Sequence, residues 1–239
     1  MLASFTAGVE YQRGDVDQDG KVSISDVTTL INYLLTNQWP ADELDHEWVD
    51  MGLPSGTLWA TCNVGASCPE EYGDYFAWGE TESKEVYNWS TYKWLNDSDG
   101  TMIKYCTQSD YGTIDNKTEL DPEDDAAYVN WGPSWRMPTL EQIDELINNC
   151  SSQWTTQNGV NGRLFTGPNG NSLFLPAAGY IWDSSLDLAG TFGGYWSRTL
   201  QSSYSYFAYY LDFRSGSIHR SATNRSGAIV VRAVRVSQN

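Results

Sequence analysis

Histidine, basic residues and long apolar runs are scarce in this chain of 239 residues. It holds 2 His and 14 Lys plus Arg against 31 Asp plus Glu, which gives a formal net charge of -17. Because proteins bind nucleic-acid backbones through clustered Lys and Arg, this balance argues against a nucleic-acid partner. An anionic membrane surface is disfavoured by the same sign. No apolar run reaches the length of about 18 residues that would predict a membrane span.

Targeting and zinc-binding patterns are also missing. Residues 1–12 lack a basic start followed by an apolar stretch, so no secretory signal is visible. We expect an extracellular, cell-surface or phage-particle protein, and the sequence does not choose between these routes. Its four cysteines form no CxxC pair, which argues against structural zinc and leaves disulfides and free thiols both open. They are Cys62, Cys68, Cys106 and Cys150.

A calcium loop is the first motif that is present. Residues 15–26 place oxygen-bearing groups at loop positions 1, 3, 5, 7, 9 and 12, with a glycine at position 6 for the sharp turn. Calcium prefers six to eight hard oxygen ligands, and this spacing supplies them. The alternative is a solvated acidic turn. The predicted ligands are Asp15, Asp17, Asp19, the Lys21 carbonyl, Ser23 and Asp26.

An amphipathic helix is predicted directly after the loop. Apolar residues from Ile24 to Leu35 recur at helical spacing before Pro40. Together, loop and helix resemble one repeat of a dockerin over about residues 13–37. Dockerins usually carry two repeats, and no second loop is visible here. A lone repeat does not present the usual paired helices to a cohesin, so the sequence favours a structural or linking module over cohesin docking.

The remainder of the chain reads as a larger domain of short strands and long loops, broken by Gly, Asn, Asp and Pro. One helix is predicted after Pro138, where Thr139 and Gln142 form a capping box and an apolar face continues to Cys150. The polar segment 96–126 predicts a long surface excursion. We therefore expect a calcium module at residues 1–38, a linker at 39–47 and a ligand-binding domain at 48–239.

Five segments of the large domain carry a second resemblance. They are Val49–Gly65, Tyr72–Thr81, Trp135-Arg-Met-Pro-Thr139, Leu175-Pro-Ala-Ala-Gly179 and Gly194-Tyr-Trp-Ser197. They resemble the major paralogous domain (Fib-succ type) of bacterial surface proteins, a relative of formylglycine-generating enzymes, over about residues 46–236. The resemblance implies an α+β, C-type-lectin-like fold with a small twisted antiparallel sheet and a C-terminal strand returning beside the first.

The sequence lacks the residues that catalysis and calcium-dependent sugar binding use in proteins of that fold. The formylglycine-generating relatives use cysteines near the end of the domain, yet no cysteine follows Cys150. His46 and His219 have no local nucleophile partner, so we expect no enzyme activity. Lectins of that fold bind sugar through Glu-Pro-Asn or Gln-Pro-Asp and a later Trp-Asn-Asp, and none of these tripeptides occurs. A glycan could still stack on exposed aromatic side chains.

The stretch from Arg198 to Val230 is the candidate ligand surface. Alternation in residues 206–214 predicts a strand with Phe207, Tyr209, Leu211 and Phe213 inward, and a turn at Ser215-Gly216 predicts a hairpin. Rigid tyrosines beside directional donors are typical of binding surfaces, and this basic region of an acidic chain favours an acidic protein or glycan ligand. The predicted ligand-binding residues are Arg198, Tyr204, Tyr206, Tyr210, Asp212, Arg214, His219, Arg220, Asn224 and Arg225.

Three functions follow from this surface. The first is a receptor or adhesin whose C-terminal face is varied by a diversity-generating retroelement, as in some relatives of the implied fold. The second is a carbohydrate-binding surface protein of a cohesin–dockerin-like assembly. The third is a structural surface or phage tail protein, and an ordinary solvated hairpin is the plain alternative for the face itself.

Overall fold

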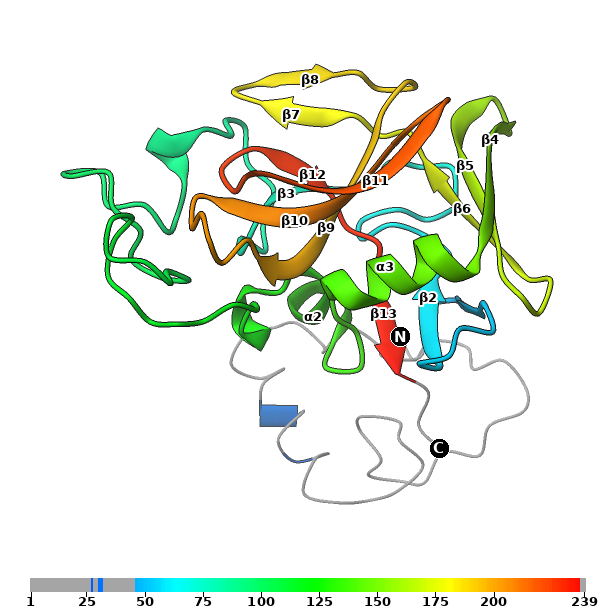
Figure 1. Cartoon of the computed structure of the whole chain (residues 1–239), viewed down its shortest axis with the longest axis horizontal. Coiled ribbons are helices and arrows are strands. Elements are labelled where there is room, and N and C mark those ends of the chain that lie inside the picture. Colours follow the sequence, from blue (N-terminus) through cyan, green and yellow to red (C-terminus); the bar gives the residue numbers. More distant parts are fainter. Residues whose placement is uncertain (1–26, 28–29, 32–45, 237–239) are drawn as a thin grey trace. The chain divides into compact units, whose positions relative to one another are not determined.

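The computed structural model describes Val27, Leu30, Ile31 and residues 46–236 (Figure 1). The chain divides into two compact units, Met1–Leu44 and Asp45–Asn239. Val27, Leu30 and Ile31 are helical and leave 54%, 41% and 49% of their surface exposed. All the predicted calcium ligands lie outside the described residues: Asp15, Asp17, Asp19, Lys21, Ser23 and Asp26.

Residues 46–236 form three β-sheets (Figure 1). The first has the order β1-β2-β13, with β1 (Trp48–Asp50), β2 (Thr57–Ala60) and β13 (Val234–Val236). The third has the order β4-β5-β6, with β4 (Ser151–Gln157), β5 (Val160–Thr166) and β6 (Ser172–Pro176). The C-terminal strand β13 does return to the first sheet, but it pairs with β2 and not, as expected, with the first strand.

The second sheet has seven strands and is the centre of the domain. Its order is β11-β10-β9-β12-β7-β8, and β3 pairs with β12 off this path. The strands are β3 (Tyr75–Ala77), β7 (Tyr180–Trp182), β8 (Ser185–Asp187), β9 (Gly193–Leu200), β10 (Phe207–Arg214), β11 (Ser217–Asn224) and β12 (Ala228–Val230).

Side chains from both faces of this sheet are buried. On β9, Tyr195 belongs to a core cluster with Trp59 and Phe213, whereas its neighbour Trp196 belongs to a cluster with Trp78. Because successive strand residues point to opposite faces, the central strands are covered on both sides. Because these central strands are buried on both faces, the positions of their ends are fixed.

The expected α+β class is wrong, because the domain is mostly β. Residues 46–236 contain thirteen strands but two α-helices, α2 (Ala126–Trp131) and α3 (Leu140–Asn149), besides the short 3-10 turns η1 (Trp89–Thr91) and η2 (Pro122–Asp124). After α3 the chain continues as strands through β13. The β4–β5 hairpin turns at Asn158 and Gly159, with φ of 48° and 85°, which fits the primed turns that join two strands tightly.

The predicted helix after Pro138 is confirmed as α3. Its N-cap Thr139 accepts a hydrogen bond from the Gln142 N–H, and the Gln142 side chain accepts one from the Thr139 N–H. The apolar face buries Ile143 and Leu146, and the helix ends at the C-cap Cys150. Among the described helices, none is long and apolar enough to cross a membrane.

The predicted hairpin is also confirmed, with one change of register. β10 pairs antiparallel with β11 around the turn at Ser215-Gly216. Leu211 and Phe213 are buried and Arg214 is exposed, as expected. However, the β9–β10 register shifts between Ala208 and Tyr210, so Ala208 is fully buried and Tyr210 packs partly against the core. A bulge of this kind breaks simple alternation.

The segment 96–126 is irregular but is more than a surface excursion. It contributes Met102, Tyr105 and Cys106 to the interior, each with 0% exposure. The buried Arg225 guanidinium holds this segment in place, because the guanidinium donates hydrogen bonds to the carbonyls of Lys104 and Tyr105 at 3.2 and 3.1 Å. All four cysteines are free thiols.

Candidate functional site

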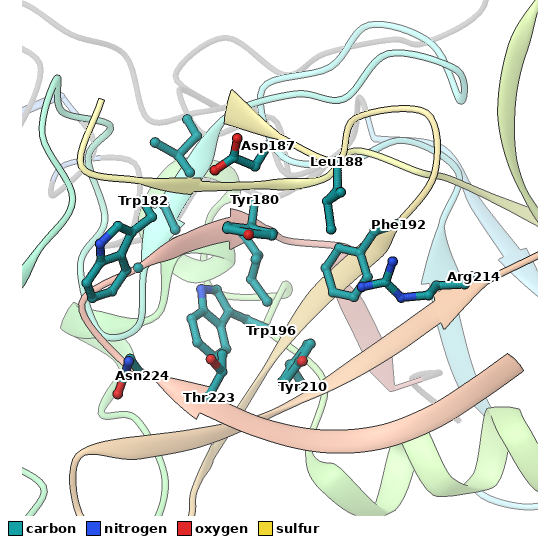
Figure 2. A pocket seen from close by; sticks show the side chains of 14 residues that line it. Tyr180, Trp182, Asp187, Leu188, Phe192, Trp196, Tyr210, Arg214, Thr223 and Asn224 are labelled. Atoms are coloured by element: carbon teal, nitrogen blue, oxygen red, sulfur yellow. The ribbon is translucent and has the colours of Figure 1, made fainter. Parts of the chain in front are cut away.

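An open pocket of about 450 Å³ lies within residues 46–236. Figure 2 shows it bounded by the β7–β8 hairpin on one side and by β9, β10, β11 and β12 on the other. Its volume is in the range of small-ligand sites. Five aromatic side chains line it: Tyr180, Trp182, Phe192, Trp196 and Tyr210.

The aromatic lining is held rigidly. Trp196 is 1% exposed, and its indole Nε1 donates to the Phe76 carbonyl at 2.8 Å. Edge-to-face contacts then join Trp196 to Tyr210 at 6.0 Å and Tyr180 to Phe192 at 6.0 Å between ring centroids. Burial, and next the charge of Asp212, raise the pKa of Tyr210 to about 12, so its hydroxyl stays protonated. A ligand would therefore meet a preformed apolar wall with hydroxyl groups at its edges.

Polar side chains stand around this wall. The Arg214 guanidinium lies 5.0 Å from the Phe192 ring centroid, a cation–π distance. No carboxylate within residues 46–236 forms an ion pair with it. Asp187, Thr223 and Asn224 also line the pocket. In Figure 2, Arg214 and Phe192 lie at one end, and Trp182 and Asn224 at the other.

The backbone at the rim adopts unusual conformations. Leu188 lines the pocket, leaves 41% of its surface exposed and has φ 56°. This left-handed region is strained for a leucine. Gly179 has φ 72°, and a Cβ there would come within 2.2 Å of the Asp187 carbonyl oxygen. One strained residue, Leu188, therefore belongs to the pocket lining, and strained backbone is often found at functional sites.

A second pocket of about 250 Å³ lies next to Asn224. Trp89, Leu95, Gly100, Tyr204 and Tyr206 complete its lining. The rings of Tyr204 and Tyr206 meet edge to face at 5.9 Å, and Trp89 meets Tyr206 at 5.3 Å. Since the Tyr206 hydroxyl donates to the Gly100 carbonyl at 2.9 Å, its ring is also fixed.

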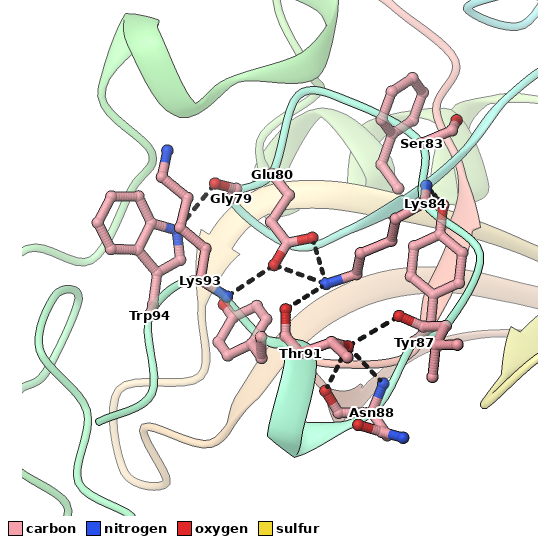
Figure 3. Close-up of polar contacts among 12 residues, drawn as sticks. Gly79, Glu80, Ser83, Lys84, Tyr87, Asn88, Thr91, Lys93 and Trp94 are labelled. Atoms are coloured by element: carbon pink, nitrogen blue, oxygen red, sulfur yellow. Dashed lines mark hydrogen bonds and ion pairs between the residues drawn. The ribbon is translucent and has the colours of Figure 1, made fainter. Parts of the chain in front are cut away.

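A polar network positions the loop that carries Trp89 (Figure 3). Glu80 is 8% exposed, and its carboxylate accepts from Lys84 Nζ at 2.7 and 2.9 Å and from the Lys93 N–H at 2.8 Å. Lys84 also donates to the Thr91 carbonyl. One carboxylate thus ties both ends of the loop 84–93 together.

Some predicted ligand residues meet at the two pockets. Tyr210, Arg214 and Asn224 line the larger pocket, whereas Tyr204, Tyr206 and Asn224 line the smaller one. These five come from β10, β11 and the connection before β10. Their residue types, tyrosines beside polar donors, were enough to predict them from the sequence.

The other predicted ligand residues line neither pocket. Arg225 is fully buried, which corrects its expected place on the surface. Arg220 pairs with Asp144 of α3 at 2.6 Å, and Arg198 pairs with Glu119 at 3.0 Å. His219 is exposed beside Asp212, whose carboxylate accepts from Ser221.

Sequence reasoning missed the β7–β8 side of the pocket. Tyr180, Trp182 and Asp187 lie on this hairpin, and Phe192 follows it. The signal was the alternating run Tyr180-Ile-Trp182, which predicts a strand directly after the Leu175–Gly179 motif. Nothing local indicates that this strand faces β10.

One group of carboxylates has metal-like spacing but is already neutralised. Ligand atoms of Asp121, Glu123 and Asp124 lie within 4.8 Å of one another. Lys104 Nζ lies among them, 2.7 Å from Asp121 Oδ2 and 2.6 Å from Asp124 Oδ2. Lys117 pairs with Asp121 as well. We therefore assign these carboxylates to a structural ion-pair network.

Comparison with known proteins identifies one segment. Residues 13–50 match the Dockerin type I domain family. The match covers the predicted calcium loop and helix, and it extends through the predicted linker into β1. No curated protein and no solved structure matches the chain. The dockerin resemblance is thus confirmed, whereas the resemblance of residues 46–236 to the Fib-succ type domain stays a prediction.

Proposed function

We propose that this chain is a non-enzymatic binding protein, carried in an extracellular or cell-surface assembly by its dockerin segment. The domain at residues 46–236 would capture a ligand in the aromatic pocket between the β7–β8 hairpin and β10. The observation that carries the proposal is that one chain combines this preformed pocket with a segment that matches a known attachment family. It favours the assembly interpretation over the retroelement-diversified receptor.

The attachment rests on the dockerin match. Dockerin type I domains bind calcium and interact with cohesins, and they occur in extracellular or cell-surface proteins. This favours a cohesin-like protein partner over the linking module that the lone repeat suggested. Val27, Leu30 and Ile31 are helical residues at i, i+3 and i+4 spacing with exposed side chains. A partner that covers an apolar helix face recognises such a stripe.

Calcium fits the donor set of the segment. Four aspartates, Ser23 and the Lys21 carbonyl supply only hard oxygen donors, which calcium prefers over nitrogen or sulfur. The bound ion would neutralise clustered carboxylates and order the loop. It would supply no chemistry to the pocket.

Calorimetric titration tests the attachment. We expect calcium to bind the full chain, and to bind the Asp15→Ala, Asp19→Ala double variant at least about tenfold more weakly, because two of the hard ligands are gone. Capture by an immobilised type I cohesin should follow the same pattern. Asp110→Ala removes an exposed acid from the other unit and is the control. Equal calcium heats for all three proteins would contradict the proposal.

The pocket is suited to binding and poorly suited to catalysis. Its lining offers one carboxylate, Asp187, and no histidine or cysteine. Glycoside hydrolysis generally needs a pair of carboxylates, and acyl transfer needs a nucleophile with a base. The sequence lacks the C-terminal cysteines of the formylglycine-generating relatives. We therefore propose binding without turnover.

Blocking the pocket tests the binding role. The Thr223 side chain points into the pocket from β11 (Figure 2). Thr223→Trp should fill part of the space and abolish capture of ligands found in a screen of glycans and surface peptides. Arg220→Trp places the same bulk on an exposed residue of the opposite face of β11, outside the lining, and should leave capture unchanged. Equal capture by both variants would move the site elsewhere.

The hypothesis of a receptor whose C-terminal face is varied by a retroelement is a separate proposal. A diversified face requires a reverse transcriptase gene nearby and a near-copy of the 3′ end of this gene, with mismatches confined to adenines. The resemblance of residues 46–236 to the Fib-succ type domain is compatible with either role. Absence of both gene features would remove diversification without affecting the pocket.

A further inference from the structure

The two pockets share a residue. Asn224, at the end of β11, lines both the larger and the smaller pocket. In Figure 2 it lies at the end of the larger pocket that is opposite Arg214. The two hollows therefore follow one another, from Arg214 through Tyr210 and Thr223 to Asn224, and then to Tyr206 and Tyr204. A ligand that fills both must be elongated.

Charged side chains indicate which end of this path an anionic group of the ligand would occupy. Arg214 carries a guanidinium without an ion-pair partner among the described residues, on the wall of a protein whose net charge is -17. Its contact with the Phe192 ring holds it at one end of the larger pocket. Asp187 lines the same pocket and repels anions. An anionic group is therefore favoured at the Arg214 end, because guanidinium and carboxylate form charge-assisted hydrogen bonds there.

The chemistry of the lining favours a sugar chain over a peptide. Extended peptides commonly bind by adding a strand to a free sheet edge, where backbone N–H and C=O groups are unpaired. Here β10, β9 and β12 are paired on both sides within the sheet, and the two ends of its order, β11 and β8, each keep a free edge. Most of the wall therefore offers side chains and not unpaired backbone groups. Aromatic faces can pack against the C–H face of a pyranose ring, while Asp187, Thr223 and Asn224 can bond its hydroxyl groups.

We propose that the joined pockets bind one elongated glycan that carries a carboxylate. The acidic sugar occupies the larger pocket with its carboxylate at Arg214. The chain passes Asn224 and places a further sugar against Tyr204 and Tyr206 in the smaller pocket. This inference rests on the proposed binding function and adds the class of ligand, its direction and its length.

An array of glycans tests charge and length together. It would present uronic-acid and sialic-acid glycans as short and long chains, each beside its methyl ester. We expect at least one acidic family to bind, with the ester about tenfold weaker or worse. Arg214→Gln should erase the preference for the acid. Arg220→Gln removes an arginine from β11 whose side chain pairs with α3, and should change nothing.

The smaller pocket is tested by chain length. Tyr204 is 39% exposed, so Tyr204→Ala should fold normally. We expect long glycans to bind the parent chain more tightly than short ones, and Tyr204→Ala to lose this advantage while binding of short acidic glycans is kept. If long and short chains bind the parent equally, the joined path is wrong.

The two proposals fail in different ways. Ligands that Thr223→Trp blocks but that are neutral glycans or peptides, and that ignore Arg214→Gln, would overturn the acidic glycan and leave the pocket function standing. If Thr223→Trp blocks the binding of no probe, whether glycan or peptide, both proposals are overturned. Binding of acidic glycans that persists in Arg214→Gln would also overturn the present inference.

Discussion

Two arginines, Arg225 and Arg232, lie fully buried without a carboxylate partner among the described residues. Arg225 is satisfied instead by oxygens that carry no full charge. It donates to the Tyr92 hydroxyl at 2.8 Å and to the Ser205 carbonyl at 2.8 Å, besides the carbonyls of segment 96–126. Its guanidinium also lies 4.8 Å from the Trp78 ring centroid. One buried side chain therefore joins several loops.

Loss of Arg225 should destabilise the domain strongly. Arg225→Met fills much of the volume but leaves several buried acceptors without donors, at about 1–3 kcal/mol each. We expect a loss of about 3 kcal/mol or more in the free energy of unfolding, measured by urea denaturation. Arg220→Met, at an exposed ion pair, should cost under about 1 kcal/mol. Similar losses for both would show that Arg225 does not join these loops.

Asp125 is a further residue whose effect on the stability of the domain can be predicted, because burial shifts its pKa. Burial raises the pKa of its carboxyl to about 6, although N–H groups of Tyr128 and Met137 donate to it and lower the pKa. Its ordinary value is 3.8. A raised folded-state pKa contributes stability that is full below the unfolded value and is lost as pH rises through the folded value.

The pH dependence of Asp125 follows from this sign. Asp125→Asn mimics the protonated acid, so its stability relative to the parent should improve as pH rises from about 4 to about 7. Urea denaturation of both proteins at several pH values measures the difference. A difference that is constant across this range would mean that the folded carboxyl titrates at its ordinary pKa.

At the scale of elements, the loop 84–93 depends on Glu80. Glu80→Gln keeps an acceptor for the Lys93 N–H but removes the charge that Lys84 faces. We expect the free energy of unfolding to fall by about 1–3 kcal/mol, because the bond involves a buried charged group. Hydrogen exchange should also quicken at Thr91 and Tyr92, whose N–H groups donate to the carbonyls of Asn88 and Trp89. Glu85→Gln, at an exposed site of the same loop, is the control, and equal effects would contradict this role.

Elements with local signals could be predicted from the sequence. Thr139 and Gln142 identify the start of α3 because a capping box acts within four residues. Ser215-Gly216 likewise marks the β10–β11 turn. The bulge at Ala208 and Tyr210 could not be predicted, because it depends on how β9 pairs with β10. The incorrect α+β class came from the family resemblance, whereas the local pattern of short strands with one predicted helix agrees with a domain that is mostly β.

At the scale of the whole molecule, the two proposed functional regions differ in how the sequence encodes them. The predicted calcium ligands stand within twelve consecutive residues, so spacing alone predicts them. The pocket brings Tyr180 and Asp187 to Tyr210 and Asn224 through sheet pairing, which no local pattern specifies. The sequence therefore predicted the dockerin-like segment and three of the residues that line the pocket, Tyr210, Arg214 and Asn224.

Fluorine NMR of the full chain labelled with fluorotryptophan tests the pocket most directly. Trp182 lines the pocket, whereas Trp154 packs on Phe213 in a different core cluster. A glycan or peptide that the chain captures should shift the Trp182 resonance and leave that of Trp154 unchanged. If captured ligands shift other tryptophans and leave both Trp182 and Trp196 untouched, this pocket is not where the protein binds.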